Sequence, residues 1–119
     1  GVVCKSYMHA SDLAEAIWQI CEKAPPGRIY NAGPQRPSSI RELVERVAEA
    51  AGIAFDALTD LKPGRAGEDR QYWLDSSRIQ GELGWRPRID LQTGISDCLA
   101  WGRKYLDQLP APAPFVLRA

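Results

Sequence analysis

Residues 64–87 read GRAGEDRQYWLDSSRIQGELGWRP, and this stretch carries most of the information about the fold. Arg65 stands between glycines, and Glu68 follows it three positions later, ahead of a short aromatic run. Residues 75–77, Asp-Ser-Ser, are typical of the start of a helix, and Gly84 is typical of its end. We interpret the stretch as a ligand-binding loop that leads into a helix.

Three further helices are predicted on either side of this stretch. Apolar residues recur at helical spacing after Ser11, and Pro25-Pro26-Gly27 ends the pattern. A second pattern follows Ser39 and closes at Gly52, with Ser39 and Glu42 spaced as a capping box. A third pattern begins at Asp90. With residues 75–84, the sequence predicts four helices.

Short extended segments are predicted between the helices. Residues 2–9 and 28–32 are rich in residues that favour strands, residues 53–58 could form another, and residues 71–74 are expected to be extended. The end of the second segment, Asn31-Ala32-Gly33, is a candidate binding edge. Helices alternating with short strands predict an α/β protein.

Length and charge narrow the class of protein. The 119 residues suit one domain, which we expect over residues 1–109, followed by a proline-rich surface tail over residues 110–119. Fifteen basic and fifteen acidic side chains cancel, so overall charge attracts neither nucleic acid nor an anionic membrane. No apolar run is long enough to span a membrane.

The chain offers little for metal binding or catalysis. Three widely spaced cysteines and one histidine do not make a metal site, and they indicate reduced, partly buried thiols in a cytoplasmic protein. We expect His9 to be a structural strand residue. The ten glycines contain no G-x-G-x-x-G, and no tyrosine has a lysine four positions later. We therefore predict no catalytic residue. A first residue of Gly1 rather than Met suggests a fragment, a processed product or a tag remnant.

Four segments, in order, resemble motifs of the extended short-chain dehydrogenase/reductases, the NAD-dependent sugar-nucleotide epimerase/dehydratase family. Residues 5–14, KSYMHASDLA, resemble R-D-Y/W-I-H/Y-V-x-D-L-A, and residues 29–33, IYNAG, resemble Y-N-I-G. Residues 65–68, RAGE, resemble R-x-G-D/H, and residues 82–87, ELGWRP, resemble E-L-G-W-x-P. The resemblance implies the C-terminal portion of a Rossmann-type enzyme, with four helices and a few short strands, lacking the N-terminal dinucleotide-binding part.

The resemblance also implies roles for individual residues. By position, Lys5 and Arg65 would bind the diphosphate, and Glu68 would accept hydrogen bonds from the ribose hydroxyls. Lys5 replaces the arginine of the family motif and loses its bidentate fork. Alternatively, Arg65 and Glu68 form a surface salt bridge and Lys5 is a solvated edge charge.

Two further residues are candidates for substrate binding. Asn31 could contact the ligand or satisfy the backbone of its own loop, and Tyr72 could stack on a base or pack in the core.

Three functions are compatible with this sequence. The first is the nucleoside diphosphate sugar binding region of an NAD-dependent epimerase/dehydratase, with no cofactor bound by this chain itself and no catalysis by it alone. The second is a free-standing module that binds nucleotide sugars or a protein and forms a dimer through an exposed sheet edge. The third is a structural domain whose binding site has decayed.

Overall fold

The computed structural model describes residues 3–60 and 69–110. Its elements, in chain order, are β1 (Cys4–Lys5), α1 (Ala10–Lys23), β2 (Ser38–Ser39), α2 (Ile40–Ala51), α3 (Phe55–Leu58), α4 (Ser77–Leu83), α5 (Leu91–Tyr105) and the 3-10 turn η1 (Leu106–Gln108). The four helices predicted from the sequence are confirmed as α1, α2, α4 and α5. The short helix α3 was not predicted.

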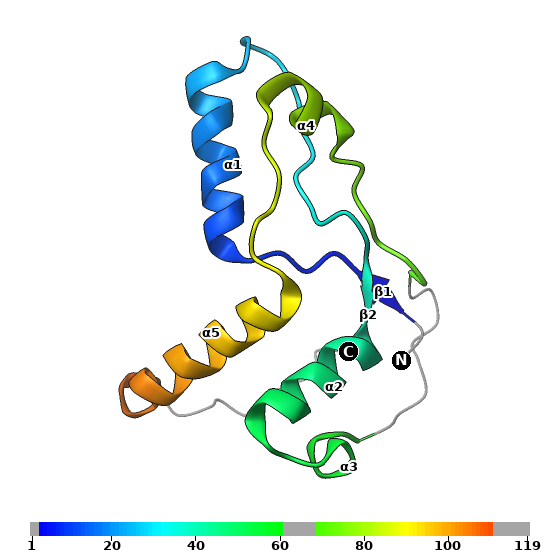
Figure 1. Cartoon of the computed structure of the whole chain (residues 1–119), viewed down its shortest axis with the longest axis vertical. Coiled ribbons are helices and arrows are strands. Elements are labelled where there is room, and N and C mark those ends of the chain that lie inside the picture. Colours follow the sequence, from blue (N-terminus) through cyan, green and yellow to red (C-terminus); the bar gives the residue numbers. More distant parts are fainter. Residues whose placement is uncertain (1–2, 61–68, 111–119) are drawn as a thin grey trace, which may run out of the picture.

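The helices form two groups joined by a small sheet (Figure 1). Helices α1 and α4 lie side by side in one group, and α2, α3 and α5 form the other. Strands β1 and β2 pair antiparallel between the groups, with Cys4 opposite Ser39 and Lys5 opposite Ser38. The sheet therefore brings the start of the chain to the first turn of α2.

The buried core lies between α1 and α4. Ala16 of α1, Ile79 of α4 and Trp85 beyond α4 are almost fully buried, and partly buried apolar residues surround them: Met8, Ile20, Tyr30, Ala32 and Leu83. A small alanine opposite a large indole lets the two helices approach closely. This packing fixes the E-L-G-W segment against α1.

Asp12 fastens the segment after α4 to the first turn of α1. Its buried carboxylate accepts hydrogen bonds from the backbone N–H groups of Arg88, at 3.1 Å, and Ile89, at 3.0 Å. Its main-chain oxygen accepts a third hydrogen bond, from the indole of Trp85 at 3.1 Å. A buried carboxylate is costly unless it is hydrogen-bonded, so Asp12 has a structural role in the described part of the chain.

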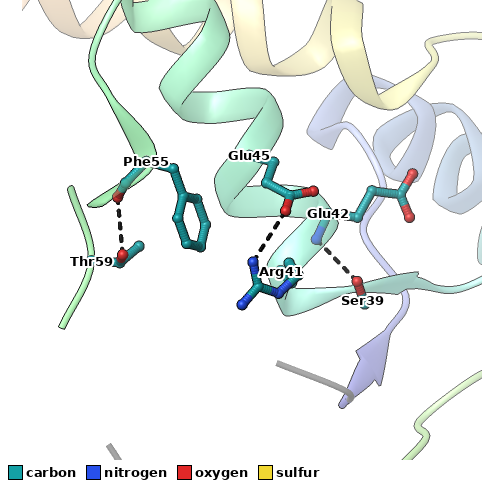
Figure 2. A network of polar contacts seen from close by, with 6 residues as sticks. All are labelled: Ser39, Arg41, Glu42, Glu45, Phe55 and Thr59. Carbon is teal, nitrogen blue, oxygen red and sulfur yellow. Dashed lines mark hydrogen bonds and ion pairs between the residues drawn. The ribbon is translucent and has the colours of Figure 1, made fainter. Parts of the chain in front are cut away.

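Helix α2 has the ends that its sequence predicts. The Ser39 hydroxyl accepts a hydrogen bond from the Glu42 backbone N–H at 3.0 Å (Figure 2). Gly52 ends the helix with a φ of 71°. The capping box is half formed, because the Glu42 carboxylate points away from Ser39 and pairs with Arg46 at 3.0 Å. The ion pair with Arg46, four residues further along the helix, takes the place of the reciprocal bond between the Glu42 carboxylate and the Ser39 backbone N–H.

Helix α4 begins and ends where its sequence predicts, and α5 begins where its sequence predicts. The Asp75 carboxylate accepts a bond from the Ser77 N–H at 2.9 Å, and the Asp90 carboxylate accepts one from the Thr93 N–H at 2.9 Å. Each of these bonds stabilises the charged carboxylate and lowers its pKa. Gly84 ends α4 with a φ of 70°, a conformation that glycine adopts without strain.

The strand predicted over residues 2–9 is much shorter than expected. Only Cys4 and Lys5 form a strand, because the register would next place Ser6 opposite Pro37, which has no N–H to donate. His9 is also not a strand residue. It is the N-cap of α1, and its Nδ1 accepts a hydrogen bond from the Ser11 N–H at 3.2 Å, so the helix begins before Ser11.

Two other predicted strands are wrong. Residues 28–32 have no ladder partner among residues 3–60 and 69–110, and a strand forms only where another strand pairs with it. Residues 53–58 contain the single turn α3. The centroid of the Phe55 ring lies 5.0 Å from the Arg41 guanidinium, and the main-chain oxygen of Phe55 accepts a hydrogen bond from the Thr59 hydroxyl (Figure 2).

The cysteines differ from the prediction of partly buried thiols. Cys4 is half-buried, but Cys21 and Cys98 are exposed, and none forms a disulfide. Within residues 3–60 and 69–110, no helix has the length and apolar character that a membrane span requires.

Candidate functional site

The backbone of residues 70–72 lies against β1, and this places Tyr72 beside Lys5. The Cys4 N–H donates to the Arg70 oxygen, and the Tyr72 N–H donates to the Cys4 oxygen, both at 2.9 Å. The Ser6 hydroxyl also donates to the Tyr72 oxygen, at 3.4 Å. Segments separated by more than sixty residues in the sequence thus meet at one edge of β1.

Lys5 and Tyr72 are brought into direct contact. The Lys5 ammonium lies 5.8 Å from the centroid of the Tyr72 ring, within the range of a cation–π contact. The Tyr72 side chain is 55% exposed, so its ring is available to a ligand. A positive charge beside an open aromatic ring suits a ligand that combines an anionic group with a flat or apolar surface.

Asn31 is held near this region without touching it. It is exposed, and its side chain forms no hydrogen bond with another residue in the described ranges. The backbone just after it is fastened to the segment beyond Tyr72: the Ser76 hydroxyl donates to the Gly33 oxygen at 3.3 Å, and the Trp73 indole donates to the Pro34 oxygen at 3.2 Å. The structure therefore joins the two segments, but not Asn31 with Lys5.

Arg65 and Glu68 lie outside the described residues. Their roles as a diphosphate ligand and a ribose acceptor remain predictions. Within the described residues, the chain immediately after them is held at β1 by the Cys4–Arg70 hydrogen bond.

Cavities lie around these segments in the described part of the chain. One of about 250 Å³ lies between Pro34 and α4, beside Trp73. One of about 690 Å³ has arginines in its lining and extends from Tyr7 to the first turns of α2. One of about 550 Å³, between α2 and α5, is lined mainly by apolar side chains and offers little to a phosphate.

Tyr7 lines two of these cavities. Burial raises the pKa of its hydroxyl, and Cys4 adds a smaller contribution in the same direction.

Sequence reasoning did not find the residues that line these cavities. Arg36 and Arg88 belong to the lining of the 690 Å³ cavity, but 52 positions separate them in the sequence. The signal available was local: Arg36 stands in a proline-flanked loop, and Arg88 follows the E-L-G-W-x-P motif.

The residues present do not fit a metal or NAD. No three His, Cys, Asp or Glu side chains of residues 3–60 and 69–110 are close enough to share a metal ion. The sequence has no G-x-G-x-x-G turn, whose backbone N–H groups would bind the pyrophosphate of a dinucleotide. No step that involves NAD is therefore assigned to these residues.

Comparison with known proteins identifies the class. The fold is that of the C-terminal portion of Rossmann-type, extended short-chain dehydrogenase/reductases. The family model described as GDP-mannose 4,6-dehydratase matches residues 3–98, and the chain belongs to this family of NAD-dependent epimerases and dehydratases.

Two sequence relatives are dTDP-glucose 4,6-dehydratases. The dTDP-glucose 4,6-dehydratase of Streptomyces griseus is 35% identical over 105 residues, which cover 88% of this chain and 32% of the relative. The human dTDP-D-glucose 4,6-dehydratase is 29% identical over 109 residues, which cover 87% of this chain and 31% of the relative. The chain thus spans about a third of the length of these relatives.

Solved structures give the same picture. DesIV, the dTDP-glucose 4,6-dehydratase of Streptomyces venezuelae with NAD and TYD bound, aligns with a TM-score of 0.82 at 25% identity, over 91% of this chain and 33% of that one. The UDP-glucose 4-epimerase of Thermotoga maritima with UDP-glucose aligns with a TM-score of 0.80 at 27% identity, over 89% of this chain and 33% of the epimerase chain.

Proposed function

We propose that this chain binds a nucleoside diphosphate sugar and forms the substrate-binding portion of an NAD-dependent epimerase/dehydratase. The observation that carries the proposal is the contact between Lys5, in the first family-like segment, and Tyr72, which lies four residues after the segment 65–68. Relatives that act on dTDP-glucose, and a structural neighbour with UDP-glucose, support the same ligand class. We assign the binding to residues 1–109 and a surface position to the tail, residues 110–119.

In this proposal each residue has a distinct task. Lys5 and Arg65 bind the diphosphate, because cations form strong, charge-assisted hydrogen bonds with phosphate oxygens. Glu68 accepts hydrogen bonds from the ribose hydroxyls, since a carboxylate can only accept. Tyr72 presents its ring to the nucleotide, and Asn31 contributes an amide at the edge of the site. Lys5 acts as a point charge where the family motif has an arginine fork, so its contribution is less directional.

The chain on its own holds the substrate and does not carry out the redox chemistry. Hydride-transfer chemistry in an enzyme of this family would be supplied by NAD. The residues of this chain bind and orient the nucleotide sugar for that reaction. We further propose a cytoplasmic location, which agrees with three cysteines that form no disulfide.

A thermal-shift screen tests this function. Wild-type protein is heated with UDP-, dTDP-, GDP- and CDP-sugars, and at least one should stabilise it by ~1–3 kcal/mol at concentrations well above its dissociation constant. Arg65→Ala should abolish the stabilisation. If no nucleotide sugar stabilises the wild-type protein, the site has decayed and the proposal is wrong.

A second candidate is a free-standing module that forms a dimer through an open edge. The observation in its favour is the segment 28–32, which has no strand partner in the described ranges and leaves Ile29 77% exposed. Exposed apolar strand edges invite pairing. Light scattering on wild type and Ile29→Lys tests it: the module requires a dimer that the lysine dissociates, whereas a wild-type monomer at high concentration contradicts it.

A further inference from the structure

The cavity of about 690 Å³ continues the surface that carries Lys5. Ser38, which lines the cavity, is the partner of Lys5 across the β1–β2 ladder, and Tyr7, also in the lining, is two residues further along the chain. Alternate residues of an extended chain lie on the same side. A ligand bound at Lys5 can therefore extend into this cavity, whose volume is typical of small-molecule sites.

Three arginines contribute to the lining: Arg36, Arg46 and Arg88. Arg46 is already paired with the lining carboxylate of Glu42, at 3.0 Å. The other lining carboxylate, Asp90, accepts hydrogen bonds from the backbone N–H and the hydroxyl of Thr93, at 2.9 and 3.0 Å. Both carboxylates thus have partners of their own.

Arg36 and Arg88 are the two cations of the lining without such a partner. Neither guanidinium forms a hydrogen bond or an ion pair with another residue in the ranges 3–60 and 69–110. Two uncompensated positive charges at one cavity attract an anion, and they repel each other when it is absent. The charges therefore favour a ligand with more than one negative charge.

The backbone at both arginines is held in place. The Arg88 N–H donates to the buried carboxylate of Asp12 at 3.1 Å, and the residue before Arg88 is Pro87, whose ring fixes its φ. Arg36 lies in a loop bounded by Pro34 and Pro37, whose rings fix their own φ angles. Little backbone ordering is then needed when a ligand binds, which favours affinity.

We propose that Arg36 and Arg88 form a phosphate-binding subsite in this cavity, so that a ligand diphosphate is held from the cavity as well as from Lys5. A guanidinium presents two parallel N–H groups to phosphate oxygens, which the Lys5 ammonium does not. The subsite thus supplies the bidentate contact that the lysine lacks. The proposal rests on the proposed nucleotide-sugar function for the identity of its ligand.

Inorganic pyrophosphate, titrated into ¹⁵N-labelled protein and followed by NMR, tests the subsite. The Arg36 and Arg88 side-chain Nε–H signals should shift together and saturate. Arg36→Gln and Arg88→Gln should each weaken binding at least about tenfold, as expected for a charged hydrogen bond. Arg103→Gln, a matched change on the exposed last turn of α5, should leave affinity unchanged. The spectra also show whether each variant is folded.

Two results would overturn the subsite: affinity that is unchanged in both cavity variants, or shifts at Arg103 as large as those at Arg36 and Arg88. The same titration with nucleotide sugars separates this proposal from the function. Binding that depends on Lys5 but not on the two arginines removes the subsite and keeps the function. Pyrophosphate binding at the arginines without any nucleotide-sugar binding keeps the subsite and removes the function.

Discussion

The indole nitrogen of Trp85 lies 3.1 Å from the main-chain oxygen of Asp12, although 73 positions separate the two residues. The Asp12 carboxylate accepts two more hydrogen bonds from the residues just after Pro87. Asp12 belongs to residues 5–14, the first segment of the family resemblance, and Trp85 belongs to residues 82–87, the last. The two motifs thus meet as one structural joint, which also fixes the backbone of Arg88 at the cavity.

Replacing Asp12 with asparagine should weaken this joint. The amide keeps the shape, but its NH₂ group would face a backbone N–H donor, so one buried donor loses its acceptor. We expect the free energy of unfolding to fall by ~1–3 kcal/mol, measured by urea denaturation. Glu22→Gln, an exposed change on the same helix, should alter it by less than about 0.5 kcal/mol. Equal effects of the two substitutions would contradict a structural role for Asp12.

The helix ends could be predicted from the sequence because they are local. Ser39, Asp90 and Gly84 cap their helices through residues no more than four positions away, so a short window contains the cause and the effect. Helical spacing of apolar residues gave the helices between these ends in the same way.

The strands and the site depend on partners far away in the chain, and these could not be predicted in the same way. Residues 28–32 have the composition of a strand, but pairing decides whether a strand forms. The family resemblance implied a role for Lys5, and Tyr72 was a candidate for stacking or for the core, but neither inference predicted that the two residues touch. Arg36 and Arg88 matched no motif, so only the folded chain shows that they share a cavity.

Two glycines of α4 should respond to alanine with opposite signs. Gly84 has a φ of 70°, and a Cβ there meets nothing within 4 Å, so the penalty of Gly84→Ala is the left-handed backbone alone, ~1–2 kcal/mol. Gly81 lies inside the helix, also with open space around a Cβ, so Gly81→Ala should stabilise by ~0.5–1 kcal/mol. Thermal unfolding measures both. A loss of stability in both variants would indicate contacts that this account does not include.

Removing the cap of α2 should destabilise the chain. Ser39→Ala leaves the Glu42 N–H without its acceptor and should cost ~0.5–2 kcal/mol by urea denaturation. Ser96→Ala makes the same chemical change inside α5, where the hydroxyl only bonds back to Gln92, and should be neutral or slightly stabilising. If the two variants unfold alike, the half-formed capping box does not stabilise α2.

The Tyr30 hydroxyl should titrate at unusually high pH. It donates to the Glu82 carboxylate at 2.7 Å, and this bond is the main reason that its pKa is raised above 10.0. A raised folded-state pKa contributes stability that is complete below pH 10.0 and is lost as the pH rises through the folded value. The tyrosinate absorbance of the wild type is measured against pH, and the same measurement on Tyr30→Phe is subtracted to isolate the titration of Tyr30.

Two neighbours of Tyr30 should shift this titration in opposite directions. Glu82→Gln removes the charged acceptor and should lower the Tyr30 pKa. Arg28→Gln removes a positive charge that lowers it, so the pKa should rise further. A titration that neither substitution moves would show that the Tyr30–Glu82 hydrogen bond is not formed in solution.

The most direct test of nucleotide-sugar binding is isothermal titration calorimetry with dTDP-glucose, UDP-glucose and GDP-mannose. At least one should bind the wild-type chain saturably, Lys5→Ala should weaken it at least about tenfold through loss of a charged contact, and Lys23→Ala, an exposed lysine of α1, should not change it. No heat of binding with any of the three, or equal binding by Lys5→Ala and the wild type, would contradict the account.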